Sequence, residues 1–337
     1  MSVPIISFFN NKGGVGKTSL VYHLAWMYAE RGKQVVAIDL DPQSNLSSFF
    51  LTEEKIEALW MAEDQPNTIY RCIQPLIKGI GDILSPQLEE VELNSVTVAL
   101  LAGDLALSQF EDDLATVWPE CADGRERAFR VISSFWRIIQ LAIDNYSADL
   151  VLVDMGPNLG SINRAVMIST DYLVIPLASD LFSVQGLRNL GPTLSKWRLQ
   201  WEERRFKNPT SDLKIPQGKM IPLGYIAMLH AERESRPTIA YQRWLERIPQ
   251  VYRSEILNDT ESEVPSLEAD PNRLGSLKHY RSLMPMAQDA RKPIFFLKPA
   301  DGIVGAHYYS VQDAYRDFEQ LSKSIYSSLS APNTSSN

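Results

Sequence analysis

Cysteine is nearly absent from the 337-residue chain, which contains only Cys72 and Cys121. The two form no C-x-x-C pair and only four histidines accompany them, which argues against a disulfide scaffold and against a Cys/His zinc or iron–sulfur site. Long apolar runs are also missing, since none approaches the ~18 residues of a membrane span. The apolar stretch Val3 to Phe9 lacks the basic flank and cleavage site of an export signal. We therefore expect a cytoplasmic protein without a membrane partner.

A surplus of positive charge is also lacking, because the formal net charge is −8. This value argues against a protein that coats nucleic acid over its whole surface. The charge is nevertheless uneven: residues 180–255 hold 13 Lys/Arg against 8 Asp/Glu, a local excess of +5. A basic region in an acidic protein is a candidate contact for a polyanion.

The composition, with 45% hydrophobic and 22% charged residues, is typical of a folded globular protein. Short apolar runs predict buried strands, and the first two of them flank a helix that begins near Thr18 and stops at Arg31-Gly32. This β-α-β unit predicts an α/β fold with a doubly wound, mostly parallel sheet and helices on both faces. The predicted strands are Ile5–Phe9, Gln34–Ile38, Val96–Leu101, Leu150–Val153, Tyr172–Pro176 and Met220–Leu229.

The length fits about two domains or one large α/β domain with insertions, and we expect a single domain over residues 1–329. Residues 52–95 and 230–282 are predicted to be helical insertions or extensions. Residues 311–329 place apolar side chains on one face of a final amphipathic helix. The polar tail, residues 330–337, is predicted to be disordered.

A glycine-rich loop follows the first predicted strand. The segment Asn10–Thr18 reads NNKGGVGKT and matches G-x-x-x-x-G-K-[ST], except that Asn11 replaces the first glycine. In such a loop, backbone N–H groups and the N-terminus of the following helix surround phosphate oxygens. Lys17 can reach the β- and γ-phosphates, and the Thr18 hydroxyl can bind Mg²⁺. The predicted nucleotide-binding residues are Gly13, Gly14, Val15, Gly16, Lys17, Thr18 and Ser19.

Three carboxylates are predicted at strand ends near this loop. Asp39 and Asp41 end the second strand, and Asp154 ends the strand Leu150–Val153. The carboxyl edge of a parallel sheet is where doubly wound folds bind their ligands. Asp39 and Asp154 are suited to hold water around Mg²⁺, and Asp41 to orient the attacking water. The segment Met155–Gly160 is predicted to be a switch loop near the γ-phosphate.

Lys12 is a second cation in the glycine loop. It cannot easily reach the phosphates of its own loop, so we expect it to be free to reach across a dimer interface. These residues resemble the ParA/MinD ATPases, which carry a deviant Walker A motif with a signature lysine, and ParA is the closer relative. The resemblance is carried by Lys12–Thr18, Asp39–Asn45, Val151–Asp154, Asn163–Gly186, Leu223–Met228 and Lys292–Ile294.

The resemblance implies an ATPase that uses ATP and Mg²⁺ to form a sandwich homodimer. It implies that Lys12 contacts the nucleotide of the opposite subunit, that Lys17 and Asp41 act in hydrolysis, and that Asp41 positions water. It also implies non-specific DNA binding, a stimulating ParB-like or adaptor protein, and a role in segregating or positioning DNA or another cargo. Such a protein would associate with the nucleoid.

A basic helix predicted over Arg188–Lys207 is the candidate DNA contact. It carries Trp197 and Trp201, and phosphate binding by such a patch would be independent of base sequence. Dimerisation would double the patch. The alternative is a solvated helix face with both tryptophans packed inward. The candidate DNA-binding residues are Arg188, Lys196, Arg198, Arg204, Arg205 and Lys207.

Other functions remain open on this scaffold, including a P-loop amidating or ligating enzyme and a defence or regulatory ATPase that uses the same dimer. Residues 154–158 read DMGPN where the family often has D-x-P-P-S, so the second switch is expected to differ. A MinD-like membrane helix is disfavoured because residues 311–329 carry a net charge of −1. An iron–sulfur reductase is excluded because no cysteine follows Asp154, and the lack of Asn-Lys-x-Asp favours ATP over GTP.

Overall fold

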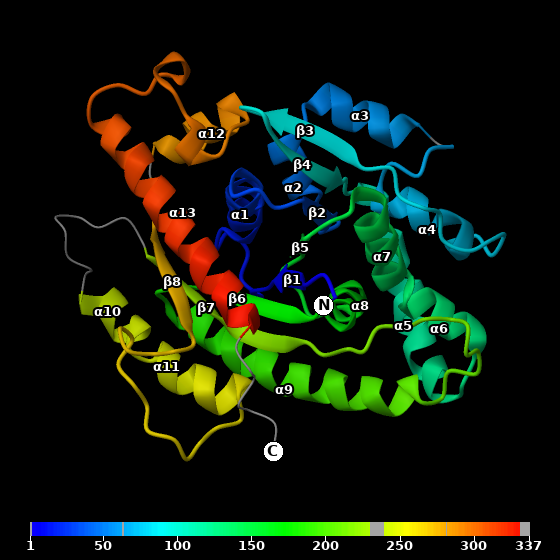
Figure 1. Ribbon diagram of the computed structural model, residues 1–337. Coiled ribbons are helices and arrows are strands. Elements are labelled where there is room, and N and C mark those ends of the chain that lie inside the picture. The colour runs from blue at the N-terminus through cyan, green and yellow to red at the C-terminus, as the bar shows by residue number, and fades with distance from the viewer. Residues whose placement is uncertain (1, 63, 230–238, 281, 331–337) are drawn as a thin grey trace.

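The computed structural model describes residues 2–62, 64–229, 239–280 and 282–330. An eight-stranded sheet of order β3-β4-β2-β5-β1-β6-β7-β8 crosses the molecule, and every pair of neighbouring strands except β3 and β4 is parallel (Figure 1). This confirms the predicted doubly wound α/β fold. The strands are β1 Ile5–Phe8, β2 Val35–Leu40, β3 Glu89–Leu93, β4 Val96–Leu101, β5 Leu150–Met155, β6 Tyr172–Ala178, β7 Ile221–Leu229 and β8 Arg273–Lys278.

The register of the central strands aligns the predicted site residues. β5 lies between β1 and β2, so that Asp154 pairs with both Phe8 and Asp39. β1, β2 and β5 are buried along their whole length, as continuous apolar runs in a parallel sheet should be. The strand that follows β1 in the chain, β2, lies on one side of β1, beyond β5. β6 lies on the other side of β1. The carboxyl ends of these strands therefore form the switch point at which such sheets bind ligands.

Helices cover both faces of the sheet, each over its own hydrophobic core. The long C-terminal helix packs beside the first helix, where the Tyr28 hydroxyl donates a 3.0 Å hydrogen bond to the Ser322 carbonyl (Figure 1). The helices on that face are α1 Lys17–Glu30, α2 Asn45–Phe50, α3 Glu53–Met61, α12 Leu283–Ala290 and α13 Ala306–Ser330. Those on the other face include α4 Ile69–Ile77, α5 Phe110–Ala122, α6 Glu126–Ile132, α7 Ser134–Tyr146, α8 Ser161–Ser169, α9 Leu181–Arg205 and α11 Ile248–Val251.

Two strands fall inside segments that were predicted to be helical. β3 belongs to residues 52–95, and β8 belongs to residues 230–282, so the helical prediction is wrong at both places. β3 reads EEVEL, a sequence rich in a residue that disfavours strands, and its pairing with β4 across the turn at Asn94 and Ser95 outweighs that preference. Both are edge strands, where one face and one edge stay solvated and the apolar pattern is weak.

The rest of the second segment and the predicted tail are described only in part. Helices occupy part of the second insertion, with α10 at Ile239–Leu245 and α11 after it. Residues 230–238 of that insertion and residues 331–337 of the predicted tail are outside the described residues, and Ser330 ends α13. Within the part of the chain that the structure describes, no helix is both long and apolar enough to cross a membrane.

Candidate nucleotide site

The glycine loop lies between β1 and α1, as predicted. Gly14 and Gly16 have φ angles of 74° and 92°, in the left-handed region that favours glycine. Gly16 is the N-cap of α1, and neither a capping side chain nor an acidic residue in the first turn competes for the free N–H groups there. A Cβ atom added at Gly13 or Gly14 would have no neighbour within 4 Å, so the loop borders open space. The backbone can therefore approach phosphate oxygens closely.

Lys17 begins α1 and is 7% exposed. Burial lowers the pKa of its ammonium group, while the charges of Asp154 and Asp41 act in the opposite direction. A buried cation at a helix N-terminus, near two carboxylates, is suited to receive the negative charge of a phosphate chain.

Asp39 and Asp154 are fully buried side by side at the ends of β2 and β5. Asp39 accepts hydrogen bonds from the Ser47 backbone N–H (2.8 Å), the Ser47 hydroxyl (2.7 Å) and the Asp41 N–H (3.3 Å). Burial raises the pKa of Asp39 to about 7, although the bonds from Ser47 oppose the rise. Asp39 is thus held in place by protein donors.

Asp154 differs from Asp39 because neither of its carboxylate oxygens has a hydrogen-bond partner among the described residues. Burial and the nearby charge of Asp39 raise its pKa to about 8, against the opposing effects of Thr18 and Lys17. Buried carboxylate oxygens that form no hydrogen bond, with the Thr18 hydroxyl close by, fit the oxygen-ligand preference of Mg²⁺. The residues present therefore fit the predicted cation.

Replacing Asp154 with asparagine is expected to stabilise the nucleotide-free protein, by on the order of 1–4 kcal/mol near pH 8 and by less near pH 5.5. The folded-state pKa of Asp154 lies above its unfolded value, so the folded chain binds more protons between about pH 4 and pH 8. The contribution of Asp154 to the stability of the wild-type protein must then fall as pH rises through that window. Urea unfolding at the two pH values measures the difference, with exposed Asp144→Asn as control, and an equal difference at both pH values would contradict the expectation.

Asp41 lies just beyond Asp39, and its Oδ1 accepts a 3.0 Å hydrogen bond from the Gln43 N–H. The structure places it beside the switch segment that follows β5. A Cβ atom added at Gly156 would lie 3.4 Å from Asp41 Oδ1. Asp41 and the predicted switch loop are therefore neighbours.

Lys12 forms an ion pair with Asp180 of the same chain and lies 5.9 Å from the centre of the Phe182 ring. Asp180 is also the N-cap of α9, where it accepts from the Ser183 N–H at 2.9 Å. Although burial raises the pKa of Asp180, the bonds from Lys12 and Ser183 lower it overall. The expectation that Lys12 is free to reach another subunit is thus corrected for this state: the ion pair must first break.

A cavity of about 270 Å³ lies beside the glycine loop, and no pattern in the sequence indicated it. Its wall opposite the loop comes from the ends of β7 and β8 and from α12. β8 was not predicted, and its weak edge-strand pattern is the reason that this wall could not be anticipated. The residues lining the cavity include Gly14, Gly16, Ser19, Met228, Lys278 and Met284.

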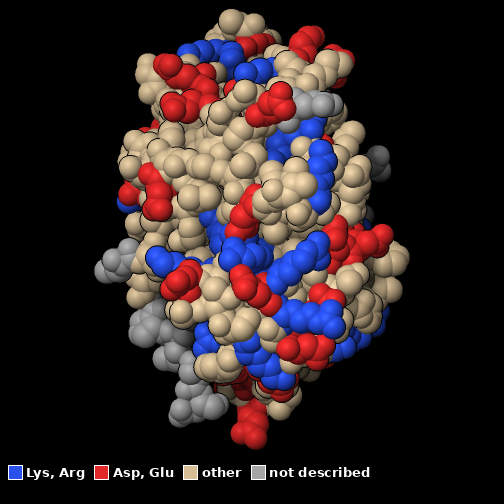
Figure 2. Space-filling model, turned by 90° about the vertical axis from the view of Figure 1, so that its right-hand side faces the viewer, with Lys and Arg blue, Asp and Glu red and all other residues tan. Residues whose placement is uncertain are grey.

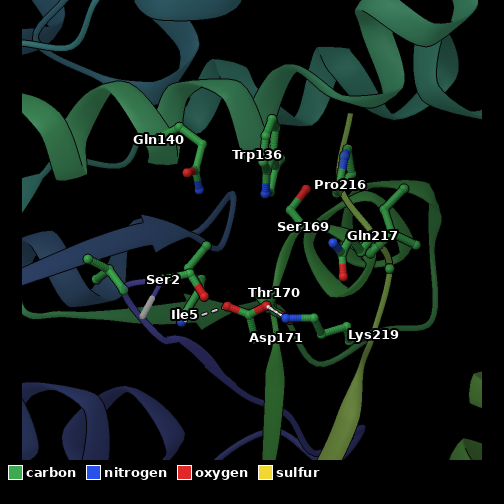
Figure 3. Close-up of a pocket in the computed structure, with 13 residues that line it drawn as sticks. Ser2, Ile5, Trp136, Gln140, Ser169, Thr170, Asp171, Pro216, Gln217 and Lys219 are labelled. Atoms are coloured by element: carbon green, nitrogen blue, oxygen red, sulfur yellow. Dashed lines mark hydrogen bonds and ion pairs between the residues drawn. The ribbon is translucent and has the colours of Figure 1, made fainter. Parts of the chain in front are cut away.

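A second cavity, of about 130 Å³, lies at the amino ends of the strands, near the starts of β1 and β6 and away from the glycine loop (Figure 3). Figure 3 shows Asp171 reaching the Ile5 N–H (3.2 Å) and Lys219 Nζ (3.0 Å). These contacts tie the two strands together at that edge. None of the residues predicted for the nucleotide site lines this cavity.

The basic helix is α9, and both of its predicted tryptophans, Trp197 and Trp201, are packed inward. Three of the six candidate DNA contacts donate hydrogen bonds to backbone carbonyl groups of the same chain. Arg198 donates to the Met220 carbonyl (2.7 Å), Arg204 to the Trp118 carbonyl (3.0 Å) and Lys207 to the Ala122 carbonyl (2.8 Å).

Arg188 and Lys196 are exposed on α9, and Arg205 is half-buried. Figure 2 shows the face at the right of Figure 1, where Lys and Arg side chains gather over the lower half with Asp and Glu among them. The DNA-binding role of all six residues stays a prediction. The contacts make Arg188 and Lys196 better test positions than Arg204.

A glycine loop between a buried strand and a helix, with a buried lysine and carboxylates on the adjacent strand ends, defines a P-loop nucleoside triphosphatase. Residues 3–206 match the protein family AAA_31, described as an AAA domain. The chain belongs to the ParA/MinD family of P-loop ATPases.

Relatives of the chain include the uncharacterized protein MJECL24 of Methanocaldococcus jannaschii and protein IncC of Escherichia coli. MJECL24 is 28% identical over 255 residues, which cover 74% of this chain and 80% of that protein. IncC is 31% identical over 200 residues, which cover 58% of this chain and 47% of IncC. The chain thus spans about half the length of IncC.

Solved structures with the same fold span nearly the whole chain. Protein DIP2308 of Corynebacterium diphtheriae has a TM-score of 0.71 and 25% identity, covering 97% of this chain and 98% of that one. The pNOB8 ParA bound to nonspecific DNA has a TM-score of 0.57 and 20% identity, with the same coverage of 97% and 98%.

Proposed function

We infer that this chain is a ParA-like ATPase that hydrolyses ATP, dimerises when ATP is bound and binds DNA without sequence preference. The observation that carries the proposal is the buried Lys17 of the glycine loop, which lies near the carboxylates that follow β2 and end β5. The second lysine of the loop, Lys12, is paired with Asp180. The nonspecific DNA in the pNOB8 ParA structure supports the DNA-binding part. The cycle would segregate or position DNA or another cargo, with the dimer on the nucleoid and a ParB-like or adaptor protein as stimulator.

In this proposal the phosphate chain lies on the loop N–H groups, and Lys17 neutralises its β- and γ-oxygens. Thr18 and Asp154 would hold Mg²⁺, directly or through water, and Asp39 would support that shell. When bound, the cation would draw charge from the phosphate oxygens. Asp41 lies beside the switch loop, where it can accept a hydrogen bond from the attacking water.

The 270 Å³ cavity is the proposed base site. It adjoins Gly16 and Ser19 at the start of α1, so a base joined to phosphates on the loop can reach it. Its walls include the side chains of Met228, Leu277 and Met284, which suit a flat apolar ring.

Replacing Lys12 with alanine should leave nucleotide affinity within about threefold of wild type but abolish the ATP-dependent dimer, because the ammonium group acts on the partner's nucleotide. Asp180→Asn weakens the ion pair that holds Lys12, so this variant should dimerise at lower ATP concentration. Sedimentation velocity measures both effects. An ATP-bound dimer of Lys12→Ala as stable as wild type would contradict the role given to Lys12.

DNA binding is tested with ATP, with ADP and without nucleotide. ATP should be required, and Arg188→Glu/Lys196→Glu should weaken binding equally for unrelated sequences. Each lost phosphate contact should reduce the slope of log affinity against log salt by about 0.9. The control Lys55→Glu/Lys78→Glu, on α3 and just after α4, should bind as wild type does. Unchanged DNA affinity, or an equal loss of nucleotide binding, would overturn the assignment of the patch.

A further inference from the structure

Asn163, in the first turn of α8, ties down the switch loop that follows β5. Its amide nitrogen Nδ2 lies 2.8 Å from the Gly156 carbonyl oxygen, 2.5 Å from the Asn158 carbonyl oxygen and 3.2 Å from Asn158 Oδ1. Glu111 of α5 fixes the start of the same helix by accepting hydrogen bonds from the Ser161 and Ile162 N–H groups. Asn163 therefore links the switch loop to the first turn of α8, which Glu111 holds in place.

The orientation of the Asn163 amide follows from these contacts. Two partners of Nδ2 are carbonyl oxygens, and the third, Asn158 Oδ1, already accepts from the Gly160 N–H at 2.9 Å. Because all three of these atoms accept hydrogen bonds, the side-chain atom that faces them must be the amide nitrogen. The amide oxygen of Asn163 therefore points away from them. That oxygen, Oδ1, has no hydrogen-bond partner among the described residues, although Asn163 is 1% exposed. A buried acceptor without a donor calls for a ligand that supplies one.

The unpaired oxygen borders the same space as the proposed water-orienting carboxylate. A Cβ atom added at Gly156 would lie 3.4 Å from Asp41 Oδ1, 3.6 Å from Asn163 Nδ2 and 3.8 Å from Asn163 Oδ1. Glycine at this position thus leaves room between two acceptor groups that come from different elements, one after β2 and one in α8. A water molecule has two hydrogens to donate, and this room offers one acceptor for each.

We propose that Asn163 is a catalytic residue whose Oδ1 binds the attacking water together with Asp41. The proposal rests on the proposed ATPase function. With both hydrogens held by acceptors, a lone pair of the water oxygen is directed at the γ-phosphorus. A bond forms between that oxygen and phosphorus, the bond from phosphorus to the β,γ-bridging oxygen breaks, and its electron pair stays on ADP. Both hydrogens of the water end on the released inorganic phosphate, so that atoms and charge balance.

The test compares single-turnover ATP hydrolysis and nucleotide affinity in three variants. Asn163→Ala removes the acceptor and the tether, whereas Gly156→Ala keeps the tether and fills the water space at ordinary contact distances. Both should hydrolyse ATP at least about thirtyfold more slowly, with affinity for a fluorescent ATP analogue within about twofold of wild type. Asn189→Ala, an exposed asparagine on α9, is the matched control and should hydrolyse at the wild-type rate.

The outcomes separate this proposal from the function on which it rests. A wild-type protein that binds but never hydrolyses ATP, even with DNA present, would overturn the ATPase function and the role of Asn163 with it. Normal wild-type hydrolysis with an unchanged rate in Gly156→Ala would overturn the role of Asn163 alone. A loss of nucleotide affinity in Asn163→Ala that matches its loss of rate, together with a normal rate in Gly156→Ala, would reduce Asn163 to a structural brace.

Discussion

Lys17→Ala is expected to abolish nucleotide binding, with Kd rising at least about a hundredfold. The reason is that the phosphate chain would lose the buried cation of the loop and would face Asp39, Asp41 and Asp154 without compensation. A charge-assisted contact of this kind contributes on the order of 2–3 kcal/mol or more when it is desolvated. Titration with a fluorescent ATP analogue measures the effect.

The matched control is Lys12→Ala, in the same loop, which should keep its affinity. Circular dichroism of Lys17→Ala should show a folded protein, because the removed charge is one that burial disfavours. Affinity of Lys17→Ala within threefold of wild type would overturn the assignment of the loop to phosphate binding.

Asp41→Ala is expected to trap the protein as an ATP-bound dimer that hydrolyses ATP at least about 10²-fold more slowly. The substitution removes the carboxylate that faces the space at Gly156 but leaves the loop, Lys17 and Asp154 in place. Binding should therefore be retained while the water is no longer oriented. Phosphate release and sedimentation, measured on the same sample, follow hydrolysis and dimerisation together.

Asp113→Ala, a carboxylate in the first turn of α5, serves as the control for Asp41→Ala and should behave as wild type does. An Asp41→Ala variant with normal turnover would show that another group orients the water. A variant that loses ATP binding would show that Asp41 shapes the nucleotide site instead.

The positions of the glycine loop and of the three carboxylates could be predicted because each is marked by a short contiguous stretch of sequence. The loop NNKGGVGKT and the three acids stand directly after apolar runs that predict buried strands. Parallel pairing then brings the carboxyl ends of those strands to one edge of the sheet. The fold class followed from the same buried apolar runs.

The contacts that could not be predicted join residues far apart in sequence. Lys12 and its partner Asp180 are 168 residues apart in sequence, and no local pattern around either residue predicts the contact. Asn163 resembles any asparagine in an early helix turn until the fold places its oxygen against Gly156. β3 and β8 were missed because edge strands need no continuous apolar run, and the base cavity was missed with β8.

The basic helix shows the limit of reading charge from sequence. Arg204 stacks on Trp118 with its guanidinium carbon 4.7 Å from the ring centre, while Arg164 stacks on the same ring at 4.3 Å. In sequence, these cations cannot be told apart from cations that face solvent. Which of them contact DNA depends on exposure, which only the fold decides.

The nucleotide dependence of the oligomeric state tests the proposed ATP-switched dimer most directly. Sedimentation velocity of the full chain should show a dimer with ATP and Mg²⁺ and a monomer with ADP or without nucleotide. A monomer under all three conditions, or a dimer that persists with ADP, would contradict the proposed ATP-controlled cycle.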